Sequence, residues 1–379
     1  MTLRGTLEHF GVVPIEPSLT VLDVFAGAGG LSLGLSWSGF RSVGAVEFDS
    51  AAAATYELNF GHVLRAGSGS PLPIEAVDFE AYRGSVDLLA GGPPCQGFSQ
   101  LGKGLIDDPR NRLWREYMRA VEQVRPRAFL MENVPPLLRS EEGRATLELA
   151  EALGYSVRSA VLSADAYGVP QRRKRAFIIG TLEGTPRLPA PIDDAILPRT
   201  VRWAIEDLPL KPNGLDWHIG RNPQAKSVER YRVVPEGGNR FDLQRARPDL
   251  TPRCWLEKPT GSTDVFGRLW WDRPALTIRT EFFKPEKGRY LHPEAHRPIT
   301  HREAARLQTF PDDFLFTGSK IEVARQIGNA VPPLLAYRLG QALHSVLMGS
   351  TSKSDRGAVR AKSRTGLRQK QLNLFNERE

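Results

Sequence analysis

The sequence predicts an α/β protein with a doubly wound, mostly parallel sheet and a smaller domain of irregular or β structure. Between residues 18 and 180, short apolar segments alternate with amphipathic ones, as in sheets covered by helices on both faces. Residues 186–300 interrupt this alternation with 15 of the 29 Pro and five of the seven Trp. So much Pro argues against long helices and central strands. A content of 41% hydrophobic and 25% charged residues is that of a globular protein.

The elements follow one another in a regular order. Apolar runs predict strands at 18–25, 42–48, 86–92, 128–133, 155–162 and within 171–180. Helical spacing predicts helices at 31–39, 113–124, 142–153, 301–310 and 331–348. Thr300 is the expected N-cap of the fourth helix, and a Pro pair begins the last one.

These elements divide the chain into four parts. We expect a first part of the sheet domain at 1–185, an inserted domain at 186–300, a second part of the sheet domain at 301–349, and a tail at 350–379. The tail is rich in Ser, Lys and Arg and poor in apolar residues, so we expect it to be disordered.

The cysteines and the apolar runs indicate where the protein works. Cys95 and Cys254 are the two cysteines of the chain, which is no disulfide framework, and we expect Cys254 to be a small buried apolar residue. The N-terminal segment lacks the apolar core of a signal peptide. No run approaches the roughly 18 apolar residues that cross a bilayer. We therefore expect a cytoplasmic protein without a membrane partner.

The net charge of +8 is unevenly distributed. Residues 186–300 hold 20 Lys and Arg against 15 Asp and Glu, and residues 350–379 hold 8 against 3, so each segment carries +5. Basic segments of this kind suit a polyanion such as nucleic acid. Charge alone leaves a solvated surface as an equal alternative.

A glycine-rich turn joins the first predicted strand to the first helix. In DVFAGAGG, Gly27, Gly29 and Gly30 allow a tight turn and the close approach of a ligand to a helix N-terminus. Glu47 ends the next strand, where an acid accepts hydrogen bonds from ribose hydroxyls. The pair indicates a cofactor that contains adenosine. Because position 32 is Ser, the turn departs from the G-x-G-x-x-G pattern of nicotinamide enzymes; a purely structural turn is the other interpretation.

Reactive side chains follow two other predicted strands. Cys95 comes after Gly-Gly-Pro-Pro, and Glu132 and Asn133 end the strand at 128–133. The carboxyl ends of strands in such sheets are where ligands bind. The sequence therefore predicts a nucleophilic thiolate and an acid side by side near the glycine-rich turn.

Six motifs in fixed order resemble one family. DVFAGAGG is followed by PPCQ at 93–96, ENV at 132–134, QRRKR at 171–175, RLQTFPD at 306–312 and QIGNAVPP at 326–333. Together they resemble the C5-cytosine DNA methyltransferases of bacterial restriction–modification systems, over about 18–345 apart from the insert. A small departure is Val24, where Leu is commoner.

The resemblance implies the chemistry and its residues. The Cys95 thiolate would add to C6 of cytosine, and Glu132 would hold N3 and the exocyclic amine. The resulting enamine would take the methyl group of S-adenosylmethionine, leaving S-adenosylhomocysteine. Arg175 would hydrogen-bond O2 of the base, with Arg173 also beside it. No metal-ligand spacing appears among the seven His, and this mechanism needs no metal.

The resemblance also implies the cofactor contacts. Phe25 would stack near the adenine, Gly27 and Gly29 would line the methionine end, and Glu47 and Phe48 would hold the ribose and cover the adenine. Asp78 with Phe79 resembles the acid and neighbour that bind the adenine amine. Asn329 would contact the methionine portion, or alternatively cap the closing helix.

The expected partner is double-stranded DNA from which the target base is flipped out. The loop at 97–112 is expected to close over the base, and residues 186–300 to read the sequence, with their Trp residues serving mainly as domain core. A related enzyme acting on RNA and a non-catalytic DNA-binding relative are the alternatives. The insert favours DNA over RNA, and intact Cys95, Glu132 and Arg175 favour catalysis.

The C-terminal tail carries a separate resemblance. Gln371, Leu372, Leu374 and Phe375 resemble the pentapeptide with which bacterial proteins dock on the DNA sliding clamp, and chance similarity is the other interpretation. We expect a monomer that works at the nucleoid.

Overall fold

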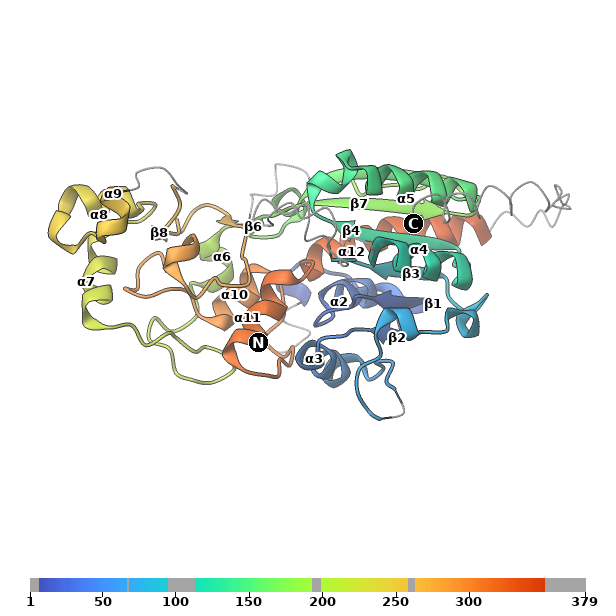
Figure 1. The fold of residues 1–379 in the computed structure, drawn as a ribbon, viewed down its shortest axis with the longest axis horizontal. Coiled ribbons are helices and arrows are strands. Elements are labelled where there is room, and N and C mark those ends of the chain that lie inside the picture. The colour runs from blue at the N-terminus through green and yellow to red at the C-terminus, as the bar shows by residue number, and fades with distance from the viewer. Residues whose placement is uncertain (1–6, 67, 95–112, 193–198, 258–262, 352–379) are drawn as a thin grey trace, which may run out of the picture.

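The computed structural model describes residues 7–66, 68–94, 113–192, 199–257 and 263–351. It shows an elongated molecule with a sheet-containing lobe at one end and a smaller lobe at the other (Figure 1). Cys95, the loop at 97–112 and the tail motif at 371–375 lie outside the described residues. Among the described helices, none has the length and apolar character needed to traverse a bilayer.

One six-stranded sheet forms the centre of the larger lobe. Its strand order is β2-β1-β3-β4-β7-β5, with β1, β2, β3 and β4 parallel and β7 antiparallel to both of its neighbours. The bounds are β1 Ile15–Val24, β2 Ser38–Val46, β3 Leu88–Gly91, β4 Ala128–Asn133, β5 Ser156–Ser163 and β7 Lys174–Thr181. The predicted fold class, a mostly parallel sheet in an α/β protein, is confirmed.

Both faces of the central strands of this sheet are buried, and the alternation of side chains along each strand explains how. Val21 of β1 faces one apolar cluster and Leu22 the other, and the strands beside it repeat the pattern. In β4, Leu130 belongs to the first cluster, while Phe129 and Met131 belong to the second. Successive residues of a strand point to opposite faces, so unbroken apolar strands require helices on both sides.

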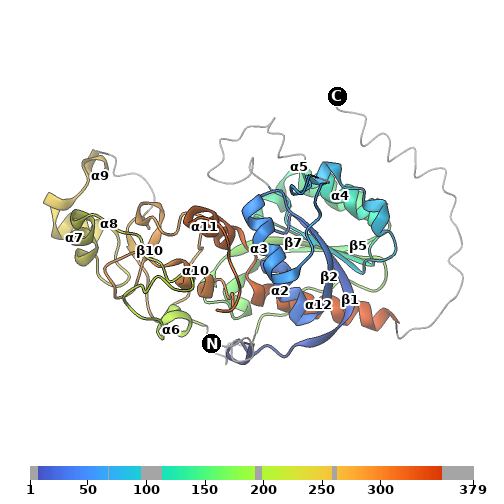
Figure 2. The same ribbon diagram turned by 90° about the horizontal axis from the view of Figure 1, so that it is seen from below.

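Helices supply those two layers, as Figure 2 shows. On one side lie α2 (Gly30–Trp37) and the closing helix α12 (Pro333–Thr351), which pack against each other; on the other side lie α4 (Leu113–Val124) and α5 (Glu141–Ala152). Helix α3 (Ser50–Phe60) packs against α11 (Lys320–Asn329), and α11 in turn contacts α10 (His301–Leu307). Helices α3 and α11, which are far apart in the sequence, are thereby in contact beside the edge of the sheet.

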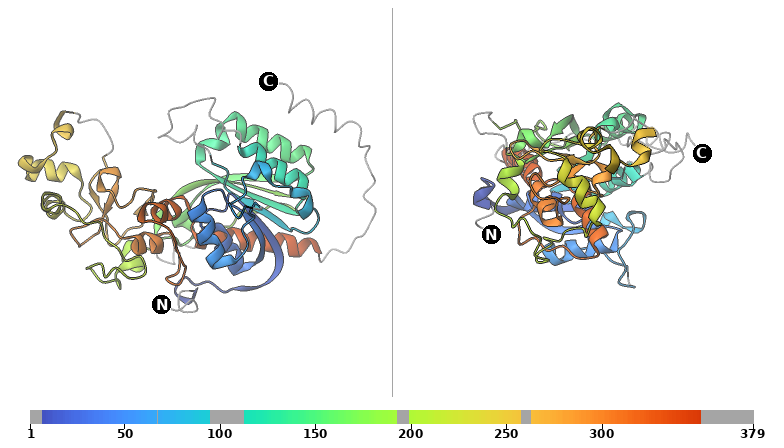
Figure 3. Two further views of the ribbon diagram at one scale, coloured as in Figure 1. Left: turned by 60° about the horizontal axis from the view of Figure 1, so that its bottom comes forward. Right: turned by 90° about the vertical axis from the view of Figure 1, so that its left-hand side faces the viewer.

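The smaller lobe contains more helix than the sequence predicts. Figure 3 shows it set apart from the sheet. Its helices are α6 Val201–Ile205, α7 Ala225–Val233, α8 Arg240–Ala246 and α9 Arg253–Glu257, and its strands are β8 Gly267–Arg268, β9 Ala275–Leu276 and β10 Arg289–Leu291. The expectation of an irregular domain without long helices is confirmed, because its longest described helix, α7, has nine residues and its described strands have two or three; the four short helices themselves were not predicted. Pro limits helix length without preventing short helices, and local caps such as the box formed by Asn239 and Asp242 stabilise them.

This lobe has a small core of its own, around Tyr231, Leu243 and Phe266, into which Trp255 packs. Other parts of 186–300 join the main core: Val201 and Ile278 are buried in the same cluster as α10 and α12. The strand β9 also pairs with β6 (Gln171–Arg172), which precedes β7. The lobe is therefore anchored to the sheet domain by packed apolar residues and a short parallel ladder.

Three local expectations can be compared with the structure. Thr300 caps α10 through a capping box with Glu303, as predicted. Helix α11 was not predicted, although Ser319 and Glu322 form the same kind of box at its start. Cys254 is exposed, which corrects the expectation of burial: it lies on α9, a short helix with no buried residue.

Candidate active site

A cavity of about 690 Å³ opens at the carboxyl ends of the parallel strands. Its walls come from the turn after β1, the end of β2, Gly92–Pro94 after β3, the end of β4 and the start of β7. Helix α11 supplies another wall through Arg325, Gln326 and Asn329. The sequence predicted the strand ends and Asn329, whereas the presence of Arg325 and Gln326 in the wall follows from the packing of α11 against α3.

The glycine-rich turn lines this cavity in the way its composition predicts. Gly27 and Gly29 have φ of 56° and 94°, in the left-handed region, and Gly29 begins α2. A Cβ on Gly29 would lie 2.4 Å from a ring carbon of Phe60. The Gly27 N–H donates to Glu47 Oε2 at 2.7 Å. Position 29 therefore needs glycine for two separate reasons, and the Gly27 N–H orients Glu47, the acid that directly follows β2.

Glu47 and two aromatic residues surround the same part of the cavity. Glu47 Oε1 accepts a bond from the Asp49 N–H at 2.7 Å, and burial raises the pKa of its carboxyl against these backbone donors. Phe48 lines the cavity while 73% exposed, and Phe25 lines it from a strained backbone with φ of 59°. An exposed aromatic face and a non-glycine residue at positive φ are both typical of ligand sites.

Asp23 is a cavity residue that the sequence analysis did not assign. It is 1% exposed, and Ser32 Oγ donates to its Oδ2 at 2.6 Å. Asp23 is one of the residues that line the cavity, and its buried Oδ1 has no hydrogen-bond partner among the described residues. Burial, aided by the charge of Glu47, raises the pKa of Asp23 to about 7. An acid ending a strand directly before a glycine turn was the available signal.

Glu132 and Arg175 form a buried ion pair in this cavity. Arg175 Nε lies 3.0 Å from Glu132 Oε1, and the two side chains are 18% and 12% exposed. Burial raises the pKa of Glu132, while Arg175 and Arg173 oppose the rise. Oε2 of Glu132 would lie 2.9 Å from a Cβ on Gly92, so the glycine leaves this oxygen accessible. Glu132 Oε2 can therefore accept a hydrogen bond from a ligand in the cavity.

The segment that follows β3 and leads to Cys95 is hydrogen-bonded to the end of β4, the strand that carries Glu132. Asn133 Nδ2 donates to the Pro93 carbonyl at 2.9 Å, and Pro93 and Pro94 line the cavity next to Glu132. The structure thus brings the chain leading to position 95 up to the carboxylate. Cys95 itself lies outside the described residues.

Arg173 lines the cavity but has partners of its own. It is 1% exposed and donates to the carbonyl oxygens of Ile278, at 3.1 Å, and Gly328, at 3.0 Å. It therefore links the smaller lobe and the end of α11 to the strand that carries Arg175. A guanidinium engaged with two carbonyl groups is a support for the cavity wall.

Three expected cofactor contacts, Gly29, Asp78 and Phe79, are not among the residues that line this cavity. Asp78 caps the 3₁₀ turn η2 (Phe79–Tyr82) by accepting a bond from Glu80, and Phe79 is fully buried in the core under α4. Ile74 and Glu75 line the cavity instead. The assignment of Asp78 with Phe79 to the adenine therefore stays a prediction from the resemblance, which the lining of this cavity does not support.

Asn329 ends α11 and lines the cavity. The first turn of the closing helix is bonded elsewhere: the Leu334 N–H donates to Thr309 Oγ1 at 3.1 Å. This bond favours the cofactor role for Asn329 over the capping role.

Carboxylates outnumber guanidinium groups around the cavity. The described lining contains six acids, Asp23, Glu47, Asp49, Glu75, Glu132 and Glu322, and three bases, Arg173, Arg175 and Arg325. A cavity with this excess favours a ligand that carries positive charge. Fold and site together are those of an α/β enzyme with an acid-rich cavity beside a carboxylate–guanidinium pair.

Comparison with known proteins makes this class specific. Residues 19–345 match the family described as C-5 cytosine-specific DNA methylase, and the chain belongs to that family. It is therefore a DNA cytosine-5 methyltransferase, and the methyl donor used by this family is S-adenosylmethionine. The predicted resemblance is confirmed.

Relatives along almost the whole chain agree. The chain is 35% identical to the type II methyltransferase M1.HphI of Haemophilus parahaemolyticus, over 86% of this chain and 87% of that protein. It is 37% identical to M.Eco47II of Escherichia coli, over 86% and 79%. A solved structure of a DNA modification methyltransferase encoded in an E. coli prophage superposes with a TM-score of 0.67 and 28% identity, covering 87% of this chain and all of that one.

Proposed function

We propose that this protein is the modification enzyme of a type II restriction–modification system and methylates cytosine at C5 in a specific double-stranded DNA sequence. The relatives described above are type II methyltransferases, which supports the system. The observation that carries the site assignment is the Glu132–Arg175 pair, 3.0 Å apart, in the cavity that also contains the glycine-rich turn.

S-adenosylmethionine is the proposed cofactor, and it supplies a methyl group on a positively charged sulfur. The cavity suits it in three ways: an unpartnered buried Asp23 oxygen, an excess of acids, and the exposed Phe48 ring. Glu47 would hold the ribose, Phe25 and Phe48 would contact the adenine, and Gly27 and Asn329 would line the methionine end. Gly29 is outside the cavity lining, and its cofactor role stays a prediction from the resemblance.

The protein residues then make C5 of cytosine reactive. The Cys95 thiolate forms a bond to C6, and the C5–C6 electron pair moves into the ring as Glu132 shares its proton with N3. The raised pKa of Glu132 favours this proton sharing. Arg175 holds Glu132 and donates to O2. After C5 has accepted the methyl group, loss of the C5 proton and departure of the thiolate restore the ring.

Residues 186–300 are proposed to read the target sequence, with the base flipped out of the duplex toward Glu132. The length of the insert supports DNA over RNA as the substrate, because reading a DNA sequence requires such a domain, and its charge of +5 suits a nucleic acid of either kind. We also propose a monomer in the cytoplasm at the nucleoid.

Bisulfite sequencing of DNA from cells that express the protein tests this function. We expect protected cytosines at one sequence, and none in cells that express Cys95→Ser, because serine is a far weaker nucleophile than a thiolate. Labelled methyl transfer to transfer RNA but not to duplex DNA would contradict the proposal and favour the RNA alternative.

The tail motif is proposed as a second contact. Leu372, Leu374 and Phe375 would dock on the bacterial sliding clamp, with Gln371 as the polar first position. Deletion of residues 371–375 should abolish binding to purified clamp while methylation of free DNA persists. Unchanged clamp binding after the deletion would contradict it.

A further inference from the structure

An ion pair at the cavity wall joins two helices that are distant in sequence. Arg325 of α11 and Asp49, the residue before α3, approach to 3.2 Å between Nη1 and Oδ2, and both line the cavity. One residue further along α11, Gln326 Oε1 accepts a bond from Thr55 Oγ1 of α3 at 2.8 Å. Two successive residues of α11 therefore hold α3, one by a buried bond and one at the surface.

Asp49 connects this ion pair to the turn that forms the adenosine end of the proposed site. Its Oδ1 accepts bonds from the N–H groups of Ala51 and Ala52, which caps α3. Its own N–H donates to Glu47 Oε1 at 2.7 Å. Phe48 lies between them in the chain, 73% exposed at the cavity. A change in the position of the Asp49 side chain should therefore move both Glu47 and Phe48.

The solvent exposure of the Arg325–Asp49 ion pair argues against a role in the stability of the fold and leaves a role at the ligand site. The Arg325 and Asp49 side chains are 53% and 39% exposed. Ion pairs that water reaches to this extent contribute little to the stability of a fold. The effect of this one should therefore appear where the position of the turn matters, which is at the ligand.

We infer that Arg325 is a positioning residue for the cofactor: through Asp49 it holds the turn 47–49 in the conformation that binds the adenosine portion. This inference rests on the proposed cofactor. It gives Arg325 of α11 the function of holding the turn 47–49 in place. Glu47 and Phe48 cannot do this by themselves, since both belong to that turn.

Calorimetry with two ligands tests it on the purified full-length enzyme. The variants are Arg325→Gln, Asp49→Asn, which retains a good helix cap, and the two combined. The control is Arg65→Gln, which breaks the pair between Arg65, which follows α3 in the chain, and Glu57 of α3. The side chains of this pair are 31% and 32% exposed, and neither residue lines the cavity. The ligands are S-adenosylmethionine, with a cationic sulfur, and S-adenosylhomocysteine, with a neutral one.

We expect Arg325→Gln to weaken both ligands about three- to fivefold at low salt, with the melting temperature unchanged and Arg65→Gln like the unchanged protein. The double variant should bind each ligand no more weakly than either single variant, because both substitutions remove the same ion pair. The difference in affinity between the variants and the unchanged protein should shrink in 0.5 M NaCl, where the screening length is shorter than at low salt by on the order of threefold. A residue that acted only through its charge would behave differently. Its removal would tighten S-adenosylmethionine and leave S-adenosylhomocysteine unaffected.

That second pattern would overturn the inference, as would equal affinities in all variants while the unchanged protein binds both ligands. In either case the proposed function would stand. If the unchanged protein bound neither ligand, the proposed cofactor and this inference would both be wrong.

Discussion

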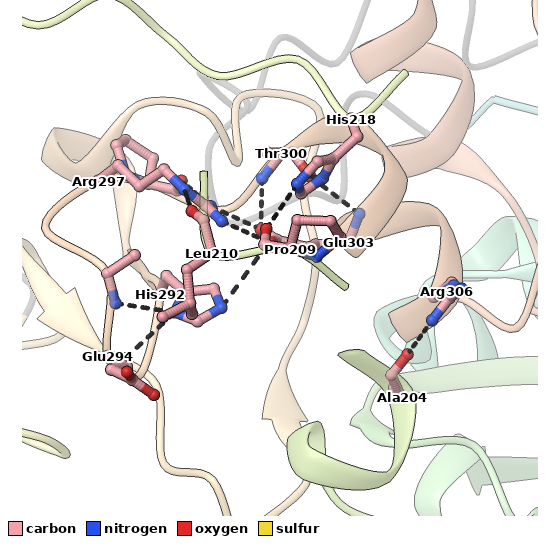
Figure 4. A network of polar contacts seen from close by, with 12 residues as sticks. Ala204, Pro209, Leu210, His218, His292, Glu294, Arg297, Thr300, Glu303 and Arg306 are labelled. Carbon is pink, nitrogen blue, oxygen red and sulfur yellow. Dashed lines mark hydrogen bonds and ion pairs between the residues drawn. The ribbon is translucent and has the colours of Figure 1, made fainter. Parts of the chain in front are cut away.

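Two buried glutamates with arginine partners show how the same pair of residue types serves different purposes in the two lobes. Glu132 in the cavity has one ion pair to Arg175, 3.0 Å away, and its pKa is raised by burial. Glu303, at the base of the smaller lobe, accepts two bonds from Arg297, at 2.7 and 2.8 Å, and one from the Thr300 N–H (Figure 4). Although burial alone would raise it, these donors hold the pKa of Glu303 below its usual value.

The difference lies in how fully each carboxylate is bonded. Glu303 is completely buried, and the residues around it extend its network: Arg297 also donates to the Leu210 carbonyl, and His218 contacts Thr300. Glu132 keeps an oxygen accessible to the cavity. A carboxylate saturated with donors stabilises a fold, whereas one left partly bonded is available to a substrate.

Glu132→Gln gives the largest expected effect on activity. The amide keeps the shape but cannot share a proton with N3, so methyl transfer should fall by about 10²–10⁴-fold. The free energy of unfolding should change by no more than about 1 kcal/mol, because the Arg175 side chain is 18% exposed and lines the open cavity. Single-turnover transfer of labelled methyl groups and urea unfolding measure the two quantities. A variant that retained most of its activity would remove Glu132 from the mechanism.

Glu303→Gln should show the reverse. Arg297 would lose its charged partner inside the protein, which costs about 3–5 kcal/mol of unfolding free energy, while the activity of the molecules that fold should persist. Urea unfolding measures it, with Glu257→Gln as the control, since the exposed Arg253–Glu257 pair is worth at most about 1 kcal/mol. Equal stability of the two variants would show that the network does not stabilise the lobe.

The pH dependence of stability sharpens the same contrast. The pKa of Glu303 is lower in the folded state, so its contribution is present above its ordinary pKa of about 4.3 and is lost as the pH falls through the folded value. Asp23 has the opposite sign: its folded pKa of about 7 means that its contribution is present at acid pH and is lost as the pH rises through that value. Asp23→Asn should therefore flatten the loss of unfolding free energy between about pH 4 and pH 7. An unchanged slope in urea titrations over this range would contradict the raised pKa.

Local sequence patterns predict much of the candidate site. Strand ends, glycines and spaced motifs place Gly27, Glu47 and Glu132 at one sheet edge, because parallel strands end together. The capped helix α10 was equally accessible, since Thr300 and Glu303 are three residues apart.

Contacts between distant segments could not be predicted in this way. The Arg325–Asp49 pair joins residues 276 positions apart, and Arg173 is held by carbonyls 105 and 155 residues away. Whether Asp78 or Glu75 reaches the cavity depends on how the chain crosses beneath α4, which no local pattern specifies. The helices of the smaller lobe were missed because Pro content predicts where helices end and says little about short ones.

The central claim, a bond between the Cys95 sulfur and C6 of a flipped cytosine beside Glu132, is tested most directly by trapping that bond. A duplex that contains the mapped target with 5-fluorocytosine has no C5 proton to lose after methyl transfer, so the thiolate cannot leave. With S-adenosylmethionine present, the unchanged enzyme should form a complex that survives denaturing electrophoresis, and Cys95→Ser should form none. A complex of equal yield with Cys95→Ser, or none with the unchanged enzyme under conditions where it methylates the unmodified duplex, would contradict the account.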